Sequence, residues 1–227
     1  MIGTDNKKII FLLEMRMFAY DLLKHTFCQE PSKNFIENLI KEEIMENFPF
    51  IEDSQSIGQG INEVSGYFIN MSEFQDEEYE KLHWDFTKMF IGPNFLPAPP
   101  WESAYLNEDR LLFQEETLEV RKKYLKYYFL PKNYPHEPDD HIGLELDFMY
   151  RLSKLTIELA EKQNTEEVIK VLNDQDTFLT EHLLQWIDRF TDDVIYHADT
   201  DFYKGMARVL KGYLELDRTI IKDLLGF

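Results

Sequence analysis

Apolar residues recur at steps of three and four along almost the whole chain, and this spacing limits the fold more than any other feature of the sequence. The first such stripe consists of Ile9, Leu13, Met17, Tyr20, Leu23 and Phe27. This spacing places the apolar side chains on one face of an α-helix. Nowhere does a sustained alternation of apolar and polar residues, the pattern of a strand, replace it. The sequence therefore predicts an all-α protein.

The same spacing predicts where the other helices lie. The expected segments are 36–48, 57–71, 79–89, 115–129, 138–161, a short helix from 164, a helix from Asp174 or Asp176 to Val194, and a last helix from Thr200 onward. Together they predict nine or more helices in one domain over residues 1–227. A proline-rich loop at 91–100 and a hinge-like break at 131–138 interrupt the pattern, and they leave open an arrangement of two packed lobes.

The net charge of the chain narrows the choice of partners. The 227 residues include 43 acidic and 24 basic side chains, for a net charge of −19. Such a chain repels a phosphate backbone and an anionic bilayer, so neither nucleic acid nor a membrane is an expected partner. A basic or arginine-bearing peptide fits this charge, because opposite charges steer encounter. The alternative is an acidic surface that only keeps the protein in solution.

The single cysteine and the N-terminal segment predict a cytoplasmic protein. Cys28 has no partner for an internal disulfide, which fits a reducing compartment, and we expect it to be a small buried apolar residue near the end of the first helix. The apolar run at residues 9–13 is cut by Glu14 and Arg16. It is too short for an export signal or a stable membrane insertion.

The proline-rich loop ends in large aromatic side chains. Four prolines within residues 93–100 stiffen the backbone, and Trp101 and Tyr105 follow them. A rigid apolar surface suits the binding of an apolar peptide, because little conformational entropy is lost. The alternative is that Trp101 holds the loop against the core.

A second local pattern is the sequence EPDDHIG at residues 137–143. Proline is suited to the first helical position, and carboxylates in the first turn face the positive end of the helix dipole. On one interpretation this is a well-made helix start, and His141 begins a buried stripe. On the other, the carboxylates and the histidine bind a cation or an arginine.

Motifs of known enzymes are scarce. The sequence has one Glu-x-x-His, at Glu80 and His83, whereas a di-iron bundle needs two. It has neither a phosphate-binding loop nor a Gly-x-Ser-x-Gly elbow. We therefore expect no enzyme, no metal and no cofactor, and in particular we do not predict a guanine nucleotide. A metal-dependent helical-bundle enzyme that uses Glu80, His83, Glu137 and His141 is the alternative.

Three motifs in the same order and spacing resemble the TorD/DmsD family of redox-enzyme maturation chaperones. They are FTKMFIGP at 86–93, PAPPWESAYL at 97–106 and EPDDHIG at 137–143. The resemblance implies an all-helical cytoplasmic chaperone. Such a chaperone binds the twin-arginine signal peptide and the immature apo-form of a molybdopterin oxidoreductase, and it delays export until the cofactor is inserted. An assembly chaperone for a client without a twin-arginine signal is a further alternative.

The resemblance also implies which residues bind the client. Carried over residue by residue, they are Met89, Phe90, Gly92, Pro93, Trp101, Tyr105, Glu137, Asp139, Asp140 and His141. Met89 stands where leucine is commoner in the family, a change that keeps an apolar contact. Trp84 and Trp186 belong to none of the motifs, and we expect both in the core. The break at 131–138 allows a domain-swapped homodimer beside the monomer.

Overall fold

The computed structural model describes residues 2–69, 74–93, 95–107, 111–131 and 137–226, and within these ranges the chain is helical without a strand. The predicted all-α class is confirmed. The elements are α1 (Ile2–Phe27), α2 (Lys33–Lys41), α3 (Gln55–Ile69), α4 (Asp76–Phe86), η1 (Thr87–Ile91), α5 (Ser103–Leu106), α6 (Glu115–Lys126), α7 (Ile142–Glu161), α8 (Thr165–Phe178), η2 (Leu179–Leu183), α9 (Leu184–His197) and α10 (Asp201–Leu225). The segments η1 and η2 are π-helical.

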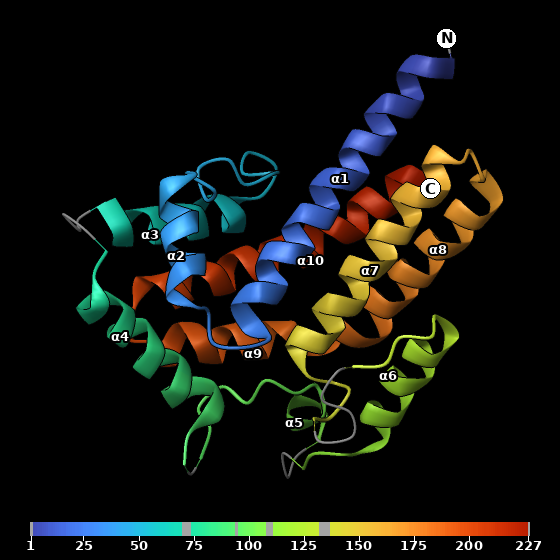
Figure 1. Ribbon diagram of the computed structural model, residues 1–227. Coiled ribbons are helices and arrows are strands. Elements are labelled where there is room, and N and C mark those ends of the chain that lie inside the picture. Colours follow the sequence, from blue (N-terminus) through green and yellow to red (C-terminus); the bar gives the residue numbers. More distant parts are fainter. Residues whose placement is uncertain (1, 70–73, 94, 108–110, 132–136, 227) are drawn as a thin grey trace.

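The long helix α10 lies at the centre of the helix packing. It contacts α3, α8, α9 and the N-terminal helix α1, while α1 and α8 both pack against α7 (Figure 1). The short helix α5 and helix α6 lie below this group of helices in the view of Figure 1. Buried side chains from α1 to α10 form one hydrophobic core. None of the described helices has the length and apolar composition needed to cross a bilayer.

The contact between α3 and α10 depends on two glycines. A Cβ atom on Gly60 would lie 2.4 Å from the carbonyl oxygen of Gly205, and one on Gly205 would lie 2.5 Å from the carbonyl oxygen of Gly60. The two backbones therefore approach so closely that neither position has room for a side chain.

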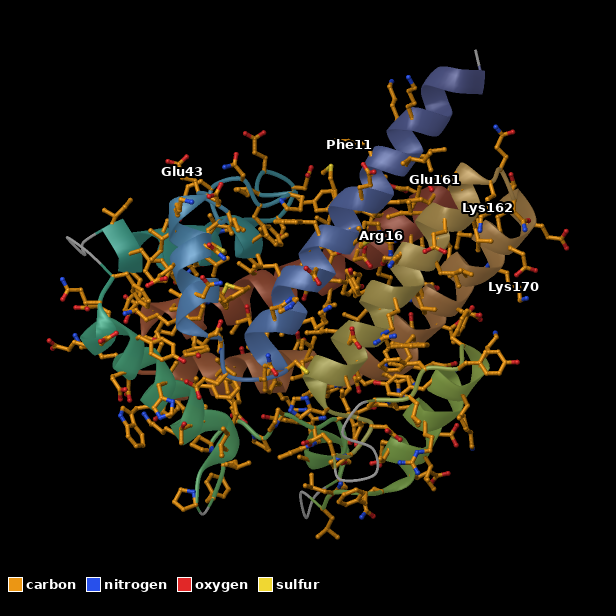
Figure 2. All side chains as sticks on the ribbon, in the orientation of Figure 1. Phe11, Arg16, Glu43, Glu161, Lys162 and Lys170 are labelled. Carbon is orange, nitrogen blue, oxygen red and sulfur yellow. The ribbon has the colours of Figure 1, made fainter. Side chains whose placement is uncertain are left out.

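A buried ionic cluster joins α1 to α8 and α10. The Arg16 guanidinium, which is fully buried, donates from Nε to Asp217 Oδ1 at 2.5 Å and from Nη2 to Gln175 Oε1 at 2.7 Å. The Tyr20 hydroxyl donates to Asp217 Oδ2 at 2.6 Å. Figure 2 shows Arg16 on the part of α1 that lies against other helices, whereas Phe11 lies nearer the end that extends past them. Removal of one partner from such a pair typically costs about 3–5 kcal/mol, because a charge is left buried.

Several helix boundaries differ from those predicted. The second helix ends at Lys41, and residues of its expected second half form turns that include Glu43, at a positive φ of 48°. No helix begins at Asp174 or Asp176, because α8 continues through η2 into α9. Both carboxylates are used in tertiary contacts instead: Asp174 accepts from Lys126 and Tyr127, and Asp176 faces Arg218. The predicted starts at Asn164 and Thr200 are confirmed as N-caps.

Two further expectations about burial were wrong. The Trp84 side chain is 62% exposed, although Trp186 is buried in the core as predicted. Cys28 directly follows α1 and is half-buried rather than buried. Met71, Asn94 and residues 132–136 of the predicted hinge lie outside the described residues.

Candidate functional site

The proline-rich loop and the EPDDHIG motif meet in space. Trp101 and His141 form an isolated antiparallel bridge. The Glu102 N–H donates to the Asp140 carbonyl at 3.0 Å, and the Ile142 N–H donates to the Pro100 carbonyl at 2.8 Å. The loop is thereby fastened to the start of α7, near α5 and α6 in the lower part of Figure 1.

His141 is the N-cap of α7, which begins at Ile142 and not at Pro138 as predicted. Its Nδ1 accepts a hydrogen bond from the Gly143 N–H at 3.0 Å, and the Trp101 ring lies edge-on at 5.8 Å. Burial lowers the pKa of His141 to about 4. The imidazole is therefore neutral at physiological pH, with the lone pair of Nδ1 available to cap the helix.

The two aspartates of the motif are buried and already bonded. The Asp140 carboxylate accepts from the Ser103 N–H at 2.9 Å and from the Thr117 hydroxyl at 2.8 Å, which ties α5 and α6 to the start of α7. Asp139 forms an ion pair with Arg121. The acidic cluster was predicted to occupy the first turn of the helix, but it precedes α7. Its main partners are groups of α5 and α6, and not the dipole of α7.

Glu137 and Trp101 are the members of this cluster that are partly accessible. The Trp101 Nε1–H donates to Glu137 Oε1 at 2.8 Å, and both residues are half-buried. Burial raises the pKa of Glu137, while the hydrogen bond from Trp101 acts in the opposite direction. A guanidinium can reach this carboxylate without the removal of a buried partner.

The remaining predicted residues divide between core and surface. Met89 and Phe90 are buried, and the Phe90 ring packs among those of Phe27, Phe86 and Phe190. Tyr105 is also buried and stacks on Trp186 at 5.5 Å. By contrast, Pro93 is exposed, and Gly92, at a positive φ of 39°, is half-buried.

An exposed apolar rim begins within the proline-rich loop, extends past it, and contains none of the residues predicted to bind the client. It consists of large side chains on the segments that leave η1 and α5, namely Ile91, Phe95, Leu106, Leu111 and Phe113. These segments lie at the bottom of the molecule in Figure 1. The signal in the sequence was the presence of large apolar residues outside any helical spacing.

Beneath the loop lies a buried acid–histidine group. The Glu102 carboxylate is 3.1 Å from His182 Nδ1, and Glu145 of α7 is fully buried. Burial and the neighbouring carboxylates of Glu102 and Asp140 raise the pKa of Glu145 well above its usual value. This shift favours the protonated form of the Glu145 carboxyl, which places less negative charge beside Glu102 and Asp140 than a carboxylate would.

The described residues do not assemble the metal site of the alternative hypothesis. They contain no group of three or more His, Cys, Asp or Glu side chains placed to hold a metal ion. His83 Nδ1 lies 2.7 Å from Glu30 Oε1, and Glu80 accepts from the Trp84 indole N–H. Glu137 and His141 have the partners described above.

Comparison with known proteins identifies the class. Residues 52–192 match the family model described as the nitrate reductase delta subunit. The chain is 30% identical over 216 residues to the chaperone protein TorD of Aliivibrio salmonicida, which covers 94% of this chain and 96% of that protein. It is 30% identical over 138 residues to the Tat proofreading chaperone DmsD of Salmonella typhimurium, 61% of each chain.

The fold and these similarities define a helical maturation chaperone rather than an enzyme. The chain belongs to the TorD/DmsD family of redox-enzyme maturation chaperones, as its three motifs predicted.

Proposed function

We propose that this chaperone binds, in the cytoplasm, the twin-arginine signal peptide and the apo-form of a molybdopterin oxidoreductase, and that it delays export until the cofactor is inserted. The observation that carries the proposal is the contact between the proline-rich loop and the EPDDHIG motif, which the Trp101–His141 bridge joins. This contact produces a rigid surface in a chain whose relatives include a Tat proofreading chaperone. Peptide binding of this kind needs no cofactor.

The accessible groups suit the two parts of such a peptide. A twin-arginine peptide has a basic end followed by an apolar stretch. The apolar rim can bury the apolar stretch, and the stiff loop loses little entropy on binding. Glu137 offers a carboxylate beside the Trp101 ring, and a charged hydrogen bond from arginine is typically stronger than a neutral one.

A test of this proposal uses Trp101→Ala. If the ring faces the peptide, a twin-arginine peptide should bind more weakly by about 2 kcal/mol, as is common for a tryptophan at the centre of an interface. Calorimetric titration measures the affinity, and thermal unfolding of the same samples reports the loss of the contacts with His141 and Glu137. Phe11→Ala, on α1, is the control for removal of an exposed ring. A Trp101→Ala protein that is folded and binds with wild-type affinity would rule out this role.

The second candidate is an assembly chaperone for a client without a twin-arginine signal, recognised by its folded surface, and the match to the family model described as the nitrate reductase delta subunit suggests such a client. Capture of the client with and without its signal sequence separates the two candidates. Loss of capture without the signal supports peptide recognition, and undiminished capture supports the second candidate. The same purified protein, sized in solution, tests the predicted domain-swapped homodimer.

A further inference from the structure

A groove along α4 contains the exposed Trp84, which lies near the end of α4 that leads through η1 to the proline-rich loop. It has a volume of about 770 Å³ and is lined by residues of α3, of α4 and of the start of α10. The Trp84 Nε1–H donates to Glu80 Oε2 at 3.1 Å, which orients the indole while its side chain remains 62% exposed. Core packing therefore does not account for this tryptophan.

The charges of the groove are predominantly negative. Lys88 is bound to Asp199 at 2.8 Å and to the His197 carbonyl at 3.0 Å, and Lys81 lies 3.7 Å from Glu77. Glu80, next to Trp84, has no ion-pair partner in the part of the chain that the structure describes. A positively charged ligand would therefore find beside an aromatic face a carboxylate whose bond, to the Trp84 N–H, leaves its charge without an ion-pair partner among the described residues.

A third group in the groove needs an acceptor. The Tyr67 hydroxyl is buried and has no hydrogen-bond partner among the described residues. Burial, together with nearby carboxylates such as Asp85, raises its pKa to about 12, so the hydroxyl remains a donor at physiological pH. A buried donor without an acceptor is costly, and a ligand carbonyl would satisfy it.

We propose that this groove binds an arginine of the client's signal peptide, with the guanidinium over the Trp84 ring and its N–H groups on the Glu80 carboxylate. The assignment rests on the proposed function. The groove is chosen because Asp139 and Asp140 are buried and already bonded. The paired arginines of the peptide therefore need carboxylates elsewhere. A planar guanidinium can combine stacking with a bidentate hydrogen bond, whereas an ammonium cannot. A peptide carbonyl next to that arginine would accept from Tyr67.

The groove is also placed to continue into the apolar rim. Ile91, which is exposed, follows Trp84 by seven residues along α4 and η1. Seven helical residues rise roughly 10 Å, which about three residues of an extended peptide can span. One peptide can therefore place an arginine in the groove and its apolar stretch along the rim toward the proline-rich loop.

The experiment compares four single variants with the wild-type chain. Trp84→Ala and Glu80→Gln change the groove. Phe11→Ala, whose ring is 63% exposed on α1, and Glu161→Gln, at the end of α7, are the matched controls (Figure 2). The probes are a synthetic peptide with two arginines and an apolar stretch, and the same peptide with two lysines. Glu80→Gln keeps an oxygen that can accept from the Trp84 N–H.

We expect the two groove variants to bind the arginine peptide roughly fivefold or more weakly, at an unchanged melting temperature. The controls should bind like the wild type. The wild-type preference for arginine over lysine should shrink in Glu80→Gln, because the bidentate carboxylate is gone.

The outcomes separate this inference from the proposed function. If the wild type does not bind the arginine peptide, both are wrong. If it binds and Trp101→Ala weakens binding while the groove variants match their controls, the groove assignment alone is wrong. An arginine preference that persists in full in Glu80→Gln also overturns the assignment.

Discussion

At the scale of single residues, His141 couples the pH of the solution to the start of α7. Its pKa is about 4 in the folded chain and about 6.5 when exposed. Between these values the unfolded chain binds a proton that the folded chain does not, so stability falls as the pH falls through this window. The difference corresponds to about 3 kcal/mol. Urea unfolding near neutral pH and near pH 4 should show this loss in the wild type and not in His141→Asn.

Asparagine is the matched replacement because it also caps helices. The carboxyls of Glu102, Glu137 and Asp139 have raised pKa values and contribute in the opposite direction, since each favours the folded state as the pH falls. Both proteins contain these groups, so the difference between them isolates His141. Parallel pH profiles for the two proteins would show that the imidazole does not titrate with folding.

The residues of the candidate site also show what a sequence can predict. The motif match located the loop and the acidic cluster, and the structure brings them together. The burial of Asp139 and Asp140 depends on Arg121 and Thr117, which lie 18 and 23 residues away in the chain. No local pattern encodes such partners. The exposure of Trp84 was missed for the same reason, because its apolar character alone indicates a core position.

At the scale of elements, periodic spacing predicted most helices, because burial on one side of a helix repeats with the helical period. The prediction of helix boundaries failed where a carboxylate could either cap a helix or bind a side chain of another helix. Asp174 and Asp176 look like N-caps, yet they bind side chains of α6 and α10, and the chain passes into η2 and α9 instead. Such choices are made by tertiary contacts and not by the segment itself.

The contact of α3 with α10 gives a prediction at this scale. In Gly205→Ala, the new Cβ would lie 2.5 Å from the Gly60 carbonyl oxygen, a backbone atom that cannot move without its helix. We expect a loss of roughly 1–3 kcal/mol in the free energy of unfolding, as is typical of overpacking. Gly66→Ala on α3 is the control, because no heavy atom lies within 4 Å of its new Cβ. Alanine there should be neutral or stabilising by up to about 1 kcal/mol.

Urea unfolding of both variants measures the two changes in the free energy of unfolding. A Gly205→Ala protein as stable as the Gly66→Ala protein would contradict the close approach of α3 and α10.

At the scale of the whole molecule, the net charge of −19 acts on any basic peptide before contact. The attraction is screened beyond about 10 Å at 0.1 M salt and beyond about 3 Å at 1 M. We therefore expect the association rate constant of a twin-arginine peptide to fall by roughly tenfold or more over this range, while its dissociation rate constant changes less. Stopped-flow measurements with a labelled peptide give both constants.

The control is the same peptide with glutamines in place of the arginines. Its association rate constant should show a much weaker salt dependence, because steering acts on the charge of the ligand. Equal salt dependence of the two peptides would show that the acidic surface does not guide the arginines, and recognition would then depend only on the short-range contacts of the loop and the groove.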